Sequence, residues 1–195
     1  MITQRWAFHG FVFFFNLSAL AFINFWTGFH ATLGTGPSLI SVLILDLWAY
    51  WAHRLFHTRV LWRLHRVHHS DPILDSSVAL RFHFLQSFLG GLGELAILSA
   101  LRPPLEIYLL FIALTWASLL FHHSQMELPL VENHLGNWIV TPHFHRAHHL
   151  QGASGNYSVI FSFWDRLFGT ALSPVRSGNY GIEGVLNPYS WKSIV

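Results

Sequence analysis

The sequence predicts an all-α membrane protein with four transmembrane helices and a cytoplasmic, histidine-rich helical cap. Two observations lead to this prediction. Apolar residues make up 52% of the 195 residues and charged residues only 10%, whereas a soluble protein of this size needs more polar residues to cover its core. The apolar residues are also gathered into four long stretches. We therefore expect one integral membrane domain over residues 1–195.

The four apolar stretches are long enough to cross a bilayer. The first, residues 7–29, holds 23 uncharged residues, which at about 1.5 Å per residue span a hydrocarbon core of roughly 30 Å. It exceeds the roughly 7–15 apolar residues of a signal peptide, and no small-residue cleavage site follows it. The second, residues 37–52, begins after a Gly-Thr-Gly-Pro turn. The third and fourth, residues 84–101 and 103–121, form a hairpin around an Arg-Pro-Pro turn.

The basic residues predict the orientation of these spans. Cytoplasmic loops carry an excess of lysine and arginine, and with the N-terminus inside, every basic residue except Arg102 faces the cytoplasm. The same arrangement places all histidines from His53 to His149 at or beyond the cytoplasmic ends of the second and fourth spans. We therefore expect two histidine-rich segments, residues 53–69 and 122–149, to converge at that face, followed by a tail from about residue 170.

Histidine is the most prominent candidate for a functional residue. The chain has 15 histidines and no cysteine, so any metal must be bound by imidazole or carboxylate groups. His53 and His57 are four residues apart, which puts both imidazoles on one face of a helix. Two further clusters share the spacing His-x-x-His-His, and these are His65, His68 and His69, and His145, His148 and His149.

Three such clusters indicate a metal site rather than scattered structural histidines. Their imidazoles exceed the four positions of a closed zinc site, and they suffice for two ions with positions left open for oxygen and substrate. His123 is the preferred further ligand and His83 a weaker one. Because adjacent helical residues point in different directions, we expect His122 to support a ligand rather than to bind. Imidazole also suits zinc, copper and nickel, so the spacing leaves the metal open.

Two acidic residues lie within the predicted spans. Asp46 lies seven residues before His53 on the same helix face, where its carboxylate either orients a ligand histidine or forms a helix cap or a hydrogen bond to another span. Glu94 is ionisable at membrane depth, which indicates either a functional group or a hydrogen bond to a neighbouring span. The glycines of residues 90–93 are expected to allow close helix packing.

These clusters resemble the histidine boxes of the fatty acid hydroxylase/sterol desaturase superfamily, in which one His-x-x-x-His is combined with two His-x-x-His-His boxes. Phe84 departs from the proline expected after the Arg-Phe-His element, and Gly155-Asn156-Tyr157 is similar to a segment near the last box. The segments that resemble small bacterial-type members are Asp46–His57 (DLWAYWAHRLFH), Leu61–Pro72 (LWRLHRVHHSDP), Ala79–His83 (ALRFH), Phe121–Ser124 (FHHS), Thr141–His149 (TPHFHRAHH) and Phe163–Thr170 (FWDRLFGT).

The resemblance implies a membrane enzyme that uses molecular oxygen to hydroxylate, or to desaturate, a C–H bond of a lipid or other apolar substrate. It implies a bacterial inner membrane, with the site facing the cytoplasm. It also implies that Asn156 supports the ligands, as Asp46 and His122 are expected to do. The cofactor implied is a pair of iron ions bound by His53, His57, His65, His68, His69, His123, His145, His148 and His149, with His83 as a weaker tenth ligand.

Electrons are expected to come from another protein, because the chain shows no dinucleotide fingerprint, no P-loop and no haem-binding or iron–sulfur domain. We expect a ferredoxin- or cytochrome-type donor with its reductase. The alternative is a non-redox zinc-binding membrane protein or a metal transporter. A transporter places ionisable groups along several spans, whereas here Glu94 is nearly alone. Nucleic-acid binding is not expected, since the arginines are interleaved with histidines and membrane anchors.

Overall fold

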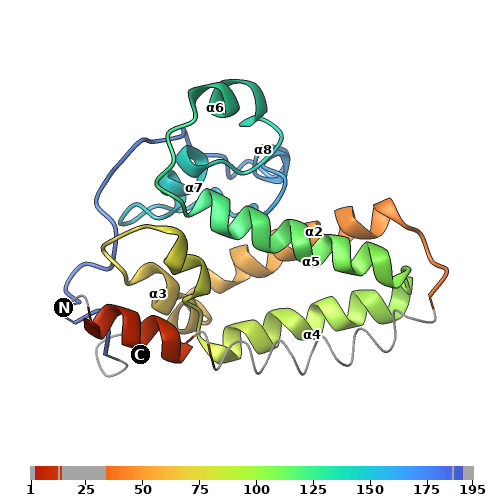
Figure 1. Cartoon of the computed structure of the whole chain (residues 1–195), viewed down its shortest axis with the longest axis horizontal. Helices are drawn as coiled ribbons and strands as arrows, with labels where there is room; N and C mark the ends of the chain where they lie inside the picture. The colour runs from red at the N-terminus through yellow and green to blue at the C-terminus, as the bar shows by residue number, and fades with distance from the viewer. Residues whose placement is uncertain (1–2, 13, 15–33, 186, 191–195) are drawn as a thin grey trace.

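Three long helices form the body of the protein (Figure 1). The computed structural model describes residues 3–12, 14, 34–185 and 187–190, and every regular element in these ranges is helical. The long helices have 18 residues each and are long and apolar enough to cross a membrane. They run along the long axis of the molecule, and α2 contacts both of the others. They are α2 (Leu39–Phe56), α4 (Phe84–Leu101) and α5 (Leu105–His122).

These helices correspond to the second, third and fourth predicted spans. The third matches the predicted residues 84–101, and the fourth begins at Leu105, after the two prolines. The second continues to Phe56 instead of ending at residue 52, because no glycine or proline interrupts it there. The first predicted span, residues 7–29, lies mostly outside the described residues, so the four-span arrangement stays a prediction.

Short helices gather around one end of the long ones (Figure 1). Residues 3–12 are helical and lie at this end as well. The helix α7 begins with proline at its first turn, and the Thr141 hydroxyl accepts a hydrogen bond from the Phe144 amide, so its first turn is capped. The short elements are α3 (Trp62–His69), the 3₁₀ helix η1 (Ser76–Leu80), α6 (Pro129–Leu135), α7 (Pro142–His148) and α8 (Phe163–Leu167).

The packing of α2 on α4 depends on a close approach at Gly93. A Cβ atom at this position would lie 2.1 Å from Cζ2 of Trp48. The same indole donates a hydrogen bond from Nε1 to the Gly90 carbonyl over 2.9 Å, which fixes the ring across α4. A Cβ at Gly90 would meet nothing within 4 Å. Of Gly90 and Gly93, it is therefore Gly93 whose missing side chain admits the tryptophan.

Replacing Gly93 with alanine is expected to destabilise the protein. The added methyl group has no space beside the Trp48 ring, and overpacking of this kind costs roughly 1–3 kcal/mol. Thermal unfolding in detergent measures the effect. The matched control is Gly90→Ala, which adds the same methyl group to open space and should leave the protein as stable as before or slightly more so. Equal stability of the two variants would contradict the close contact.

Candidate metal centre

Nine of the ten predicted ligands come together at the end of the long helices where the short helices gather. His53 lies in the last turn of α2 and His57 at its C-cap, while His123 is the C-cap of α5. The other six belong to α3 and α7 or follow α7 directly. The nine form two groups, and within each group one nitrogen from every ring lies within 4.8 Å of the others. The first group is His53, His57, His65, His69 and His148, and the second is His68, His123, His145 and His149.

Each His-x-x-His-His cluster contributes to both groups. In α3, His65 and His69 belong to the first group and His68 to the second. In the cluster at α7 the assignment is reversed, because His145 and His149 belong to the second group and His148 to the first. On a helix, residues i and i+4 lie about 40° apart, whereas residue i+3 lies about 60° to the other side. The two groups adjoin, because the rings of His69 and His149 are centred 4.3 Å apart.

The first group places two nitrogen lone pairs face to face. Nδ1 of His53 donates to the Tyr157 carbonyl over 2.7 Å, and Nδ1 of His65 donates to Oε1 of Gln86 over 3.1 Å. A neutral imidazole that donates from Nδ1 has an unprotonated Nε2. The two Nε2 atoms nevertheless lie only 3.1 Å apart. Two lone pairs at this distance repel each other unless a cation lies between them.

The second group repeats this arrangement. Nδ1 of His123 donates to the Leu119 carbonyl over 2.8 Å, and Nδ1 of His68 donates to the Arg81 carbonyl over 3.3 Å. Their Nε2 atoms are 3.1 Å apart. Two nitrogens bound at about 2.1 Å to one ion and about 90° apart would be separated by about 3.0 Å. The spacing in both groups is therefore that of ligands on a shared metal.

Burial keeps these imidazoles neutral. It lowers the pKa of His65, His68 and His69 well below the usual histidine value, and the neighbouring imidazoles lower it further. Burial likewise lowers the pKa of His123 to about 4. Their lone pairs are consequently available to a metal at neutral pH. The buried Nε2 of His148 has no hydrogen-bond partner among the described residues, as expected of a ligand nitrogen.

A loop over residues 155–161 orients one histidine of the His-x-x-x-His pattern and one of a His-x-x-His-His pattern. Its carbonyls at Tyr157 and Gly155 accept hydrogen bonds from Nδ1 of His53 and His148, each over 2.7 Å. Between them, Asn156 adopts a positive φ of 54°, a conformation that asparagine tolerates better than most residues.

The side chain of Asn156 holds that conformation. Its amide nitrogen donates to the Phe144 carbonyl, and its Oδ1 accepts from the Leu172 amide. Asn156 thus supports the ligands through the backbone rather than by touching a ring.

Two buried carboxylates hold the amides of the same loop. Asp165 accepts from the amides of Tyr157 and Ser158, both over 2.8 Å. Asp46 accepts from the amides of Ile160 and Phe161, at 3.1 and 3.2 Å. It also accepts from the indole of Trp164 over 2.9 Å. The structure therefore places Asp46 against the loop, where it can act on the ligand histidines through the loop.

The remaining predicted residues lie outside the two groups. The ring of His122 is buried and centred 3.9 Å from that of His145. Nδ1 of His83 accepts a hydrogen bond from the Leu85 amide, so this side chain caps α4. Sequence reasoning missed Gln86, for which no motif gives a signal. It also missed Asp165, which lies in a segment that carries the family resemblance.

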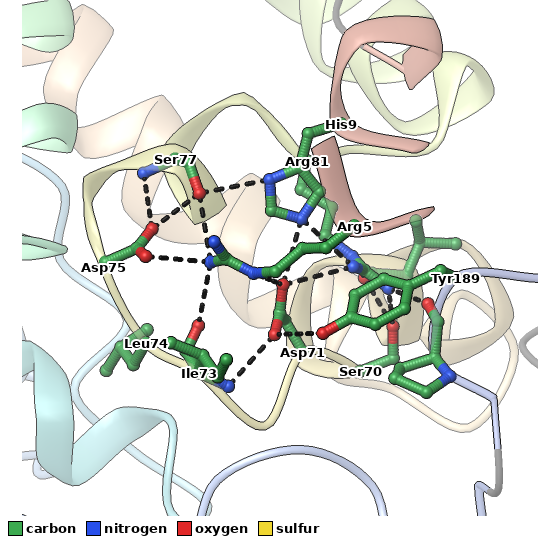
Figure 2. A network of polar contacts seen from close by, with 12 residues as sticks. Arg5, His9, Ser70, Asp71, Ile73, Leu74, Asp75, Ser77, Arg81 and Tyr189 are labelled. Atoms are coloured by element: carbon green, nitrogen blue, oxygen red, sulfur yellow. Dashed lines mark hydrogen bonds and ion pairs between the residues drawn. The ribbon is translucent and has the colours of Figure 1, made fainter. Parts of the chain in front are cut away.

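A second polar network holds the end of α3 (Figure 2). Nε of Arg81 donates to the Val67 carbonyl over 2.7 Å, directly before the candidate ligands His68 and His69. The buried carboxylate of Asp71 accepts from Arg5 over 3.0 Å and from Arg81 over 3.3 Å. Figure 2 shows these groups converging from the helical residues 3–12, the end of α3 and the segment after it. The network thus ties the N-terminal helical residues to the helix that carries three candidate ligands.

The same network includes His9, whose Nε2 lies 2.9 Å from Asp71. Burial alone would raise the pKa of Asp71. The hydrogen bond from His9 and the charges of Arg81 and Arg5 outweigh that effect and hold the pKa below its usual value. The carboxylate therefore stays ionised although its side chain is fully buried.

A cavity of about 260 Å³ opens beside the metal-ligand groups, between α2, α4 and α5. His53, His65 and His68 line one part of it, together with His123 and His145. Elsewhere its wall is mostly apolar. A cavity of this kind admits an apolar molecule and brings it to the ligand histidines.

Comparison with known proteins places the chain in one family. Residues 38–170 match the family model described as fatty acid hydroxylase. The chain is 34% identical to an ornithine lipid hydroxylase of Rhizobium tropici over 153 residues, which are 75% of this chain and 45% of that protein. It is 28% identical to the human alkylglycerol monooxygenase over 171 residues, 84% of this chain and 35% of the relative.

A methylsterol monooxygenase of Aspergillus fumigatus is 30% identical over 181 residues, 89% of this chain and 58% of that protein. The chain thus spans between 35% and 58% of the length of these three relatives. No solved structure is significantly similar to it. The family model covers more than half of the chain and includes all nine grouped histidines, so the chain belongs to the fatty acid hydroxylase family.

Proposed function

We propose that this protein is a membrane-bound oxygenase that hydroxylates a C–H bond of a lipid at a two-iron centre. The observation that carries the proposal is the pairing of unprotonated Nε2 atoms at 3.1 Å in both histidine groups. The names of the relatives support it, since they are hydroxylases and monooxygenases of an ornithine lipid, an alkylglycerol and a methylsterol. These names favour hydroxylation over desaturation.

The donor set fits a pair of ions. Five imidazoles surround one position and four the other, which leaves coordination sites for oxygen on an ion that prefers six ligands. When bound, two iron ions would supply the activation of molecular oxygen that oxidises the C–H bond. The protein would hold them through neutral imidazoles, and backbone carbonyls fix the outer nitrogens of four of these, His53, His68, His123 and His148. Such fixed outer hydrogen bonds raise the basicity of the ligand and set its direction.

The remaining task of the chain is to position the substrate. The apolar wall between α2, α4 and α5 would bind a lipid chain and exclude water from the reacting carbon. Because these helices are able to cross a membrane, the substrate would enter directly from the bilayer. We infer from the basic residues that the metal centre faces the cytoplasm, and from the resemblance to bacterial-type members that the membrane is a bacterial inner membrane. A separate ferredoxin- or cytochrome-type protein would deliver the electrons.

Metal and oxygen analysis tests this function. The protein would be purified anaerobically in detergent, iron and zinc counted per chain, and a Mössbauer spectrum recorded. We expect two irons per chain, and consumption of oxygen once a reductant and membrane lipids are supplied. Mass spectrometry of the lipids should then reveal an added oxygen atom. Zinc alone, with no oxygen consumed under reducing conditions, would contradict the proposal and favour a non-redox metal-binding protein.

Removing one grouped ligand should abolish turnover. His68→Ala deletes a nitrogen of the second group, so we expect fewer than two irons per chain and activity lower by roughly 100-fold or more. The control is His134→Ala, because His134 is exposed and belongs to neither group; this variant should retain both metal and activity. A fully active His68→Ala protein would show that the site has been assigned wrongly.

A weaker effect is expected from Gln86. Gln86→Leu keeps the size of the side chain but removes the acceptor that orients His65. Metal affinity should fall by roughly 10–100-fold, the range seen when the outer hydrogen bond of a metal-bound histidine is lost. Competition with a chelator measures it. Gln151→Leu makes the same change at an exposed position and should leave the affinity unchanged; similar affinities in both variants would refute the role of Gln86.

A further inference from the structure

The cavity between the long helices extends well beyond the histidines. Leu45 on α2, Glu94 on α4 and Thr115 on α5 all line it. In sequence they lie eight residues from His53, Gln86 and His123, which line the end nearest the metal-ligand groups. At 1.5 Å per helical residue, eight residues correspond to about 12 Å. The cavity therefore has a deep end, about two helical turns away from the ligands.

The deep end carries polar groups in an otherwise apolar wall. Oε1 of Glu94 accepts a hydrogen bond from the Tyr108 hydroxyl over 2.8 Å. The structure gives Oε2 no hydrogen bond to another described residue. The hydroxyl of Thr115 is also buried without a hydrogen-bond partner in the described part of the chain. Glu94 and Thr115 thus bring unused hydrogen-bonding atoms to the wall of one cavity.

Such groups are costly at this depth. Leu45, Trp48, Phe111 and Ile112 supply the surrounding wall. Their aliphatic and phenyl side chains cannot accept or donate a hydrogen bond at that position, and the indole N–H of Trp48 already donates to the Gly90 carbonyl. An unsatisfied buried hydroxyl or amide costs on the order of 1–3 kcal/mol. Ionisable residues inside membrane helices accordingly tend to mark the path or the binding site of a ligand.

The hydrogen bond to Tyr108 does not fully explain why a carboxyl group is present at position 94. Linking α4 to α5 requires a single acceptor, whereas the carboxyl group has a second oxygen and Glu94 lines a cavity that also reaches the histidines. We propose that Glu94, assisted by Thr115, binds a hydroxyl group of the substrate. This inference rests on the proposed function and adds a substrate class to it. The substrate is a lipid alcohol whose hydroxyl lies about 12 Å from the carbon that is oxidised.

The geometry explains how one carbon would be selected. An apolar wall alone lets a lipid chain slide, because contacts between methylene groups have no direction. A hydrogen bond at the deep end fixes the position of the chain along the cavity. The carbon presented to the histidine groups is then set by its distance from the hydroxyl. Glu94 is a specificity-determining residue in this account, and it takes no part in the chemistry of the C–H bond.

Binding of two matched probes tests the inference without turnover. With C–C bonds of about 1.5 Å, a chain of roughly ten carbons spans the cavity. We would use 1-decanol and n-undecane, which have the same number of non-hydrogen atoms. The protein would be loaded with zinc in phosphatidylcholine nanodiscs, and the affinity of each tritiated probe measured. After correction for the partitioning of each probe into empty discs, we expect wild-type protein to bind 1-decanol about tenfold more tightly than n-undecane. One hydrogen bond to a charged group has an effect of this size.

Four variants separate ligand binding from a structural role. Glu94→Leu should lose the preference for 1-decanol while its affinity for n-undecane stays the same, and Thr115→Val should lose part of it. Tyr108→Phe removes the link between the helices but keeps the carboxyl group, so its preference should persist. Glu106→Leu makes the same charge-removing change at an exposed position outside the cavity wall and should behave as wild type.

The outcomes distinguish this inference from the proposed function. An equal preference in wild type and Glu94→Leu would overturn the inference, even where the iron-loaded protein hydroxylates lipids. Loss of the preference in Tyr108→Phe and Glu94→Leu alike would also overturn it, because both would then act through helix packing. A preference that depends on Glu94, in a protein that never consumes oxygen, would support the binding site and overturn the oxygenase. Should Glu94→Leu fail to fold, Thr115→Val carries the test, because valine has the same shape as threonine.

Discussion

The mutual repulsion of facing imidazole lone pairs is the constraint on which the rest of the structure depends. In each histidine group one pair of rings, His53 with His65 and His68 with His123, donates from the outer nitrogens to fixed oxygens. The inner nitrogens of each pair therefore face one another as unprotonated acceptors 3.1 Å apart. Without a cation this arrangement is unfavourable, and burial together with the neighbouring imidazoles keeps the rings from being protonated. The fold must therefore bring histidines from α2, α3, α5 and α7 together and hold them there. A pair of bound metal ions would turn this repulsion into a source of stability, since metal binding and folding are coupled.

Buried carboxylates support the histidine groups indirectly, by fixing the backbone segments around them. Asp46 and Asp165 bind backbone amides of the loop over residues 155–161, and the carbonyls of that loop orient His53 and His148. Asp71 is paired with two arginines and fixes the segment that follows α3. In each case the negative charge is compensated by amide dipoles or guanidinium groups, which a buried charge requires. With the carboxylates away from these positions, both groups consist of imidazoles alone, a ligand that suits iron, zinc, copper and nickel.

The long helices serve both the membrane and the cavity. Close packing occurs where Gly93 admits Trp48, so α2 and α4 approach one another on one side. Beside this contact the three helices leave a cavity that runs from the histidine groups to Glu94 and Thr115. A small residue thus permits a close helix contact, as is common in membrane proteins. The exposed outer faces of α4 and α5 are rich in leucine, which suits contact with lipid chains.

The sequence by itself determined the long helices, the histidine clusters and the family, because these depend on local periodicity and on motifs within a few residues. Nine of its ten proposed ligands lie in the two groups. The tertiary structure alone decided that each His-x-x-His-His cluster serves both groups, that Asp46 and Asn156 act through a loop, that His83 caps α4, and that Glu94 faces the same cavity as the ligands. Each of these depends on how segments far apart in the chain are placed against one another; Asp46 and Ile160, for example, are separated by 114 positions. Spacing along one helix determines which side chains lie on the same face, whereas the residues that this face contacts depend on the packing of the whole molecule.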